Sequence, residues 1–168
     1  MPACRIRTAS EADVPLVASL IRELAEYERL LHEVTMTGEG LRAALFGERR
    51  HAEVAIAEDE AGEPLGFALF FHTFSTFLGQ PGIYLEDLFV RPAHRGAGVG
   101  RALLAHLAGL AAERGCGRLE WSVLDWNEPA IGFYRRLGAA PVDGWTRYRL
   151  TGEALTRLAT FPSPRRGG

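Results

Sequence analysis

A glycine-rich turn between a strand-like and a helix-like segment constrains this chain most. The turn lies within VRPAHRGAGVGRALL, residues 90–104, and it separates the apolar run IYLEDLFV at 83–90 from an Ala/Leu-rich helical segment that we expect over 98–114. Another apolar run, RLEWSVL at 118–124, follows that segment. A strand, a helix and a strand in this order predict two parallel strands joined by a right-handed crossover.

Strand and helix signals alternate along the rest of the chain. Strands are predicted for CRIRTA at 4–9, AEVAIAE at 52–58, LGFALFFH at 65–72 and WTRYRL at 145–150, the middle two as an antiparallel hairpin. Apolar spacing and caps predict four further helices, from Ser10 or Asp13 to about Tyr27, over Thr37–Phe46, over Asn127–Leu137 and from Thr151. The aromatic segment 73–82 is expected to be a loop. Residues 1–160 are expected to form one α/β domain with a mixed sheet, and 161–168 a disordered tail.

Composition excludes several classes of protein. The 19 basic residues are all arginine, and without lysine the chain has no Walker P-loop, no kinase β3 lysine and no Schiff-base lysine for pyridoxal phosphate. A formal charge of -2 disfavours nucleic acid, and no apolar run is long enough to predict a membrane span. Two cysteines without metal spacing, and a start without the apolar core of a signal peptide, predict a cytoplasmic protein that binds no metal.

The glycines at 96, 98 and 100 predict an anion site, because they let backbone N–H groups approach a phosphate at a helix N-terminus. Arg95 and Arg101 flank the turn with charge that suits a pyrophosphate. The dinucleotide fingerprint G-x-G-x-x-G fails, since Arg101 stands where its third glycine would be when the count starts at Gly96. A tight turn that binds nothing is the alternative.

The turn resembles motif A (Q/R-x-x-G-x-G/A) of the GNAT N-acetyltransferases, with Arg95, Gly96, Gly98 and Gly100 in register. ELAEYE at 23–28, YLED at 84–87 and WNEPAIGFY at 126–134 are similar to the diamine acetyltransferase branch, of spermidine/spermine type. The resemblance implies a GNAT fold, with a mostly antiparallel mixed sheet, a parallel strand–helix–strand unit and helices on both faces. It also implies acetyl transfer from acetyl-CoA to a small amine, and a homodimer.

A primary amine has a pKa of about 10, so such an enzyme must remove a proton, stabilise an oxyanion and protonate the leaving thiolate. Glu86 is the predicted base, acting directly or through water, since burial inside an apolar strand is expected to raise the pKa of a carboxyl group. Strict alternation would place Leu85, Asp87 and Phe89 on the opposite face from Glu86. For Asp87, a structural salt bridge and a functional role are rated about level.

Tyr134 is the acid that the resemblance implies, and it lies seven residues after Asn127, within about 20° on one helix face. By resemblance, the strand backbone binds the pantetheine, the turn binds the pyrophosphate and the helix start lines the sulfur end. The predicted cofactor-binding residues are therefore Leu88, Phe89, Val90, Arg95, Gly96, Ala97, Gly98, Val99, Gly100, Arg101, Asn127, Pro129, Ala130 and Tyr134.

The same resemblance assigns the amine to Tyr27, Glu28, Glu86, Asp87, Glu120, Trp121 and Ser122. For Glu28, the sequence alone would favour a solvated helix end. The segment HTFSTFLGQPG at 72–82 has no carboxylate, which favours a short diamine or an amino acid such as thialysine over a long polyamine. Two alternatives stay open: acetylation of a protein or aminoglycoside amine, and a CoA-binding sensor domain without turnover.

Overall fold

The computed structural model describes residues 4–162. Its backbone divides into two compact units, one ending at Ser122 and one starting at Val123.

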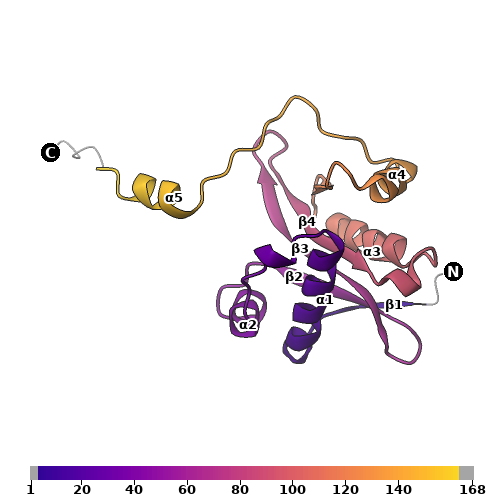
Figure 1. Cartoon of the computed structure of the whole chain (residues 1–168). Coiled ribbons are helices and arrows are strands. Elements are labelled where there is room, and N and C mark those ends of the chain that lie inside the picture. The colour runs from indigo at the N-terminus through magenta and orange to yellow at the C-terminus, as the bar shows by residue number, and fades with distance from the viewer. Residues whose placement is uncertain (1–3, 163–168) are drawn as a thin grey trace. The chain divides into compact units, whose positions relative to one another are not determined.

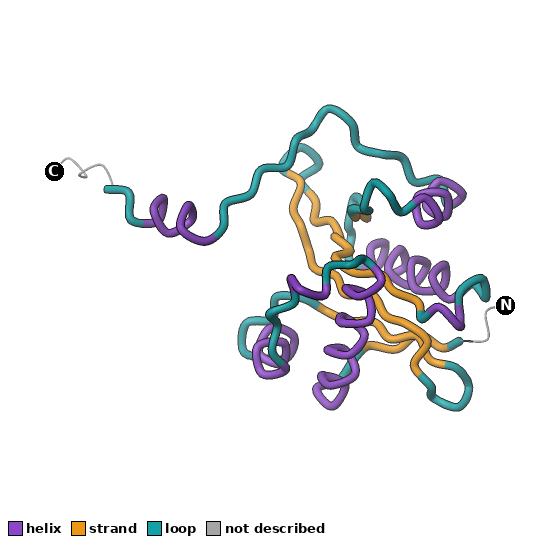
Figure 2. The backbone as a smooth tube through the Cα atoms, in the orientation of Figure 1, coloured by secondary structure: helices purple, strands orange, loops and turns teal. Residues whose placement is uncertain are grey.

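The first unit is built on a five-stranded sheet whose strands follow one another in chain order (Figure 2). The strands are β1 (Arg5–Thr8), β2 (Glu53–Glu58), β3 (Pro64–Ser75), β4 (Gln80–Val90) and β5 (Leu119–Trp121). Neighbours from β1 to β4 are antiparallel, while β4 and β5 are parallel. The predicted mixed sheet, its hairpin and its parallel pair are therefore confirmed.

Helices cover both faces of this sheet, as the resemblance implied (Figure 1). Helices α1 (Val14–Tyr27) and α2 (Gly38–Phe46) pack on one face. The core of this layer joins apolar side chains of both helices to inward-facing strand residues such as Ile56 and Phe67. Helix α3 (Val99–Glu113) contacts the strands from the other face, and it buries Leu103 and Leu107 completely. Short 3-10 turns at Glu11–Asp13, Leu31–Glu33 and Pro92–His94 complete the unit.

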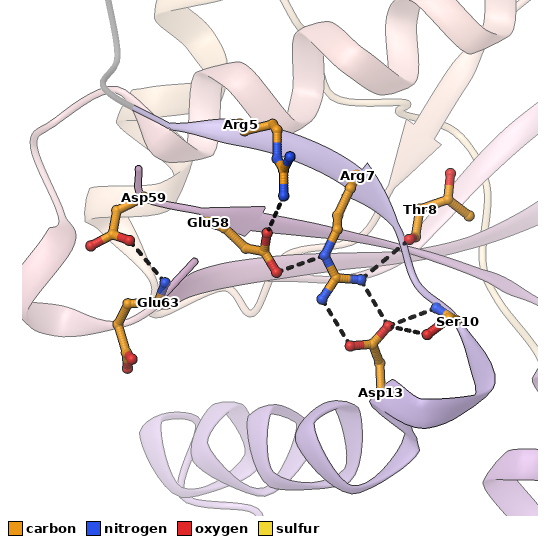
Figure 3. Close-up of polar contacts among 8 residues, drawn as sticks. All are labelled: Arg5, Arg7, Thr8, Ser10, Asp13, Glu58, Asp59 and Glu63. Atoms are coloured by element: carbon orange, nitrogen blue, oxygen red, sulfur yellow. Dashed lines mark hydrogen bonds and ion pairs between the residues drawn. The ribbon is translucent and has the colours of Figure 1, made fainter. Parts of the chain in front are cut away.

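An arginine network fixes the start of α1 to the sheet (Figure 3). The guanidinium of Arg7 donates to both carboxylate oxygens of Asp13 at 2.8 Å and to Glu58 at 2.6 Å. Asp13 also accepts from the backbone N–H and the hydroxyl of Ser10, which opens the helix as predicted. The hydrogen bond from Arg7 holds the pKa of Asp13 well below its usual range. This carboxylate stays ionised, and the guanidinium of Arg7 joins β1 to Glu58 of β2 and to Asp13 at the start of α1.

The prediction of a loop over 73–82 is wrong. β3 continues to Ser75 and β4 begins at Gln80, so only residues 76–79 form the turn. Pairs such as Phe74 with Pro81 extend the ladder, and Gly79 takes a positive φ of 63° at the turn. Cross-strand hydrogen bonding here outweighs a local sequence rich in turn formers.

The second unit contains α4 (Glu128–Arg136) and α5 (Gly152–Ala159), both at their predicted positions. The strand predicted over 145–150 is wrong: among the described residues after Ser122 there is no strand at all, and a strand forms only where a neighbour accepts its hydrogen bonds. The strand predicted over 118–124 is real but shorter. The tail prediction for 163–168 lies outside the described residues. No helix within 4–162 has the length and apolar character needed to cross a membrane.

Candidate active site

A β-bulge in β4 falls on the predicted base. Leu69 pairs with Asp87 and the next residue, Phe70, pairs with Leu85, so Glu86 is the extra residue. Cross-strand partners point to one face, which places Asp87 and Phe89 on the α1 face and Leu85 on the α3 face. The bulge therefore breaks the predicted alternation, and Leu85 does not share a face with Asp87. Glu86 itself is exposed, contrary to the burial expected for it.

Asp87 lies partly buried in a field of like charge. Burial, and then the charges of Glu86 and Glu28, raise the pKa of Asp87 to about 6. Burial also raises the pKa of Glu28, which caps the C-terminus of α1 and is only partly exposed. Glu28 is thus a half-buried helix end rather than a fully solvated one. Among residues 4–162, no arginine pairs with any of these three carboxylates, so the salt-bridge alternative for Asp87 fails as well. We call Glu28, Glu86 and Asp87 the unpaired carboxylate cluster.

The outer edge of β4 is open beyond the bulge. Pairing with β5 runs only from Ile83 to Leu85. Toward β3, the N–H of Arg91 donates to the carbonyl of Leu65. Because backbone groups alternate in direction along a strand, Leu88 and Val90 turn theirs away from β3, toward the open edge. Phe89 turns its backbone groups toward β3. The open edge thus offers the N–H and C=O groups of alternate residues to an extended ligand.

The glycine-rich turn has the geometry that its sequence predicts. Gly96 and Gly98 have φ values of 80° and 85°, which a side chain would strain, and residues 95–98 are exposed. Gly98 is the N-cap of α3, and the hydrogen bond from Ala102 to its carbonyl starts the helix. The first N–H groups of α3 have no intrahelical acceptor. Val99 is buried and anchors the turn, while Arg101 is exposed beside it.

Arg95 makes contacts that the sequence did not suggest. Its Nε donates to the carbonyl of Val90 at 2.9 Å, and its guanidinium carbon lies 4.3 Å from the centre of the Tyr27 ring and 5.7 Å from that of Phe89. This side chain therefore links the turn to the open edge of β4 and to the end of α1. No local pattern signals such a contact, because Tyr27 and Arg95 are 68 positions apart in the sequence.

The β5 residues predicted for the amine have partners of their own. Glu120 accepts from Arg118 Nε at 2.7 Å, so its charge is already balanced. The hydroxyl of Ser122 lies 2.7 Å from that of Tyr84 and joins the end of β5 to β4. Trp121 pairs with Leu85 in the parallel ladder. Of the predicted amine-binding residues, Tyr27, Glu28, Glu86 and Asp87 form the better supported group.

The remaining predicted residues belong to the second unit. Asn127 is buried, and its side-chain oxygen accepts from the N–H of Ala130 at 3.4 Å, which caps α4 as predicted. Pro129 lies in the first turn of α4, and Tyr134 lies two turns after the cap. The rings of Phe133 and Tyr134 are 5.4 Å apart. The spacing of seven residues between the cap and the phenol remains the argument for a shared helix face.

The family model described as "Acetyltransferase (GNAT) family" matches residues 17–139, most of the chain. The chain belongs to the GNAT acetyltransferase family. The match includes β4, the glycine-rich turn, α3 and α4, the elements on which the candidate residues lie.

Two curated GNAT relatives match this chain over most of its length. The thialysine N-epsilon-acetyltransferase of Bos taurus is 41% identical, over 92% of this chain and 96% of its own. The L-ornithine N5-acetyltransferase of Arabidopsis thaliana is 33% identical, over 92% of this chain and 87% of its own. This GNAT acetyltransferase is thus similar to proteins named for the acetylation of amino acids.

Solved structures support the fold. An integron cassette protein from the mobile metagenome of V. cholerae superposes with a TM-score of 0.78 and 29% identity, over 94% of this chain and 98% of that one. An aminoglycoside acetyltransferase from a soil metagenome, solved with sisomicin, superposes with a TM-score of 0.75 and 18% identity. The superposition covers 90% of this chain and 97% of that one. At that identity, the second likeness shows the GNAT fold alone.

Proposed function

We propose that this GNAT protein transfers the acetyl group of acetyl-CoA to a primary amine of a small cationic acceptor by direct attack. The unpaired carboxylate cluster carries the proposal. Three carboxylates that pair with none of the arginines in the described part of the chain leave a local negative charge, which attracts a cation. Two of them belong to β4, next to its open edge, and this edge leads directly to the glycine-rich turn.

The residues present fit a CoA thioester. The open edge of β4 offers Leu88 and Val90 as hydrogen-bonding partners for the pantetheine amides, since the backbone of Phe89 faces β3. The turn from Arg95 to Arg101 would hold the pyrophosphate with the backbone N–H groups of Ala97, Gly98 and their neighbours and with two guanidinium groups. Asn127, Pro129 and Ala130 would line the sulfur end. When bound, acetyl-CoA supplies an activated acyl group.

Proton removal from the amine falls to the carboxylates of β4. Glu86 is the base that the resemblance favours, and its place in the bulge leaves the side chain exposed to substrate or to a relaying water. Asp87 is the second candidate, because a pKa of about 6 brings its proton affinity closer to that of an amine acceptor at neutral pH. The backbone N–H of Val90 or of a neighbour would stabilise the oxyanion. The phenol of Tyr134 would protonate the departing sulfur.

A short acceptor suits the described residues. The turn of the β3–β4 hairpin, residues 76–79, carries no carboxylate that could bind a distant second or third ammonium group. The relatives named for thialysine and L-ornithine support a diamine-like amino acid as acceptor. A relative named as a spermidine/spermine N(1)-acetyltransferase-like protein is 31% identical. Diamines and polyamines are therefore also tested as acceptors.

We also propose a homodimer that works in the cytoplasm. The stretch 145–150 has a strand-like sequence, and its Trp145 and Tyr148 are exposed by 83% and 92%. A second copy of the chain would cover such aromatic side chains. Cys4 and Cys116 are free thiols, as a reducing compartment would keep them.

One assay tests the function. Thiol release from acetyl-CoA is measured with thialysine, L-ornithine, 1,3-diaminopropane, spermidine, an aminoglycoside and a lysine peptide. We expect the highest kcat/KM with thialysine or L-ornithine. Preference for the aminoglycoside or the peptide would replace the proposed acceptor, while CoA binding without release by any amine would favour a sensor domain and contradict the enzyme. A Tyr134→Phe variant that keeps the full rate at every pH would remove the assigned acid.

A further inference from the structure

We propose that Arg95 is a switch between the two substrate sites: its guanidinium contacts Val90 and Tyr27 when CoA is absent, and CoA binding displaces it from both. The inference rests on the proposed function, since it concerns the same cofactor and the same amine. It is carried by three contacts of one side chain, with the carbonyl of Val90 and with the rings of Tyr27 and Phe89.

The first contact occupies a group that CoA needs. The carbonyl of Val90 points to the open edge of β4, where a pantetheine amide would donate to it. In the structure, this carbonyl accepts from Arg95 Nε at 2.9 Å. An amide that takes the place of this donor releases one of the interactions that hold the guanidinium.

The second contact covers a group that the amine needs. The guanidinium lies over the face of Tyr27, at 4.3 Å from the ring centre. Tyr27 is the last residue of α1 and is followed by Glu28, whose charge acts on Asp87. A cation stacked on this ring keeps an ammonium group off the same face, because one aromatic face holds one cation and two like charges repel.

The guanidinium also lies next to the proposed phosphate cradle. Arg95 directly precedes Gly96, and the turn that follows presents the unpaired N–H groups of α3. A pyrophosphate placed there attracts the guanidinium through charge-assisted hydrogen bonds, which are stronger than a cation–π contact at an exposed site. CoA therefore both displaces Arg95 from Val90 and draws it away from Tyr27. By linkage, the amine raises the affinity for CoA by the same factor by which CoA raises that for the amine.

Calorimetric titration of CoA into the full-length protein tests this coupling. Replacing the ring by Tyr27→Leu removes a contact that competes with CoA, so we expect CoA to bind about two- to fivefold more tightly than to the wild type, the fold-change of an exposed cation–π contact. The matched control Tyr27→Phe keeps the ring and is expected to bind CoA as the wild type does. In an Arg95→Gln background, where CoA binding is weaker, Tyr27→Leu is expected to leave the affinity for CoA unchanged.

The outcomes separate this inference from the proposed function. If CoA does not bind the wild type, the proposed function fails. If CoA binds but Tyr27→Leu leaves its affinity unchanged or weakens it, Arg95 is a fixed structural link between α1 and β4, and the coupling is overturned. If Tyr27→Leu also tightens CoA binding in the Arg95→Gln background, the tighter binding does not come from the contact between Arg95 and Tyr27, and the inference is also overturned. Thermal melts of all variants check that each is folded.

Discussion

Helix α1 has an acidic residue at each end, and the charges around these two residues are opposite in sign. At the N-terminal end, Asp13 and the neighbouring strand residue Glu58 bind the guanidinium of Arg7 (Figure 3). At the C-terminal end, Glu28 faces the field of Glu86 and Asp87, and no arginine within 4–162 pairs with them. The first end has the favourable pole of the helix dipole for a carboxylate, and the second has the unfavourable one.

The pKa values follow this difference. Hydrogen bonds from Arg7 lower the pKa of Asp13, and hydrogen bonds from Arg7 and Arg5 lower that of Glu58, although burial acts to raise it. Burial and like charge raise the pKa of Asp87 to about 6. Within residues 4–162, none of the described arginines pairs with these three carboxylates, which is consistent with the proposal that their charge serves the amine.

The largest effect is expected from removing a carboxylate of the unpaired cluster. Glu86→Gln or Asp87→Asn should lower kcat/KM for the preferred amine by about 10²- to 10⁴-fold if that residue accepts the proton. Neither change should lower the melting temperature, because neither group stabilises the fold through a partner. Steady-state kinetics and thermal melts measure both, with the exposed Glu39→Gln as control. A variant that loses stability in proportion to its activity would assign a structural role to the residue.

A smaller effect, on stability alone, is expected at the paired end. Glu58→Gln leaves the guanidinium of Arg7 with one ionised partner fewer, and we expect the free energy of unfolding to fall by about 2 to 3 kcal/mol. The value of kcat/KM at 25 °C should stay near that of the wild type, since Glu58 lies outside the proposed site. Urea denaturation gives the first quantity. An unchanged midpoint would show that the network in Figure 3 contributes little.

The two ends are expected to respond to pH in opposite directions. Asp13 and Glu58 have lowered pKa values when folded, so their contribution is complete above the unfolded value of about 4 and is lost as the pH falls below it. Asp87 has a raised pKa, so its effect on stability becomes unfavourable as the pH rises from about 4 to about 6. Denaturation curves of the wild type and Asp87→Asn between pH 3 and pH 8 would show this loss only in the wild type. Parallel curves would contradict the raised pKa.

The smallest effect is expected at the edge of the paired network. Arg5 donates to Glu58 at 3.1 Å, but its side chain is 73% exposed. Arg5→Ala should therefore change the free energy of unfolding by less than about 1 kcal/mol, as surface ion pairs do. Adding 0.5 M salt should reduce even this difference. A loss as large as that of Glu58→Gln would mean that Arg5, not Arg7, compensates the buried carboxylate.

Local sequence predicted most of the elements. The apolar spacing of α1 and the Asn127 cap depend on neighbours within a few residues, and both are confirmed. The bulge at Glu86 was missed because it depends on the register with β3, and the longer hairpin and the absent strand at 145–150 were missed because each depends on a pairing partner. The exposed Glu86 and the half-buried Glu28 follow from the same cause.

By itself, the sequence determined the strand–turn–helix unit with its glycine-rich turn and the exclusion of lysine chemistry, since these depend on residue type and spacing. Only the tertiary structure decided which acidic groups are neutralised and which are not. The sequence does not show which charges surround Asp13 and Asp87, but folding brings Arg7 to the first and Glu28 to the second. The physical reason is that a carboxyl group's proton affinity depends on charges and burial within a few ångströms, and those neighbours come from distant parts of the chain.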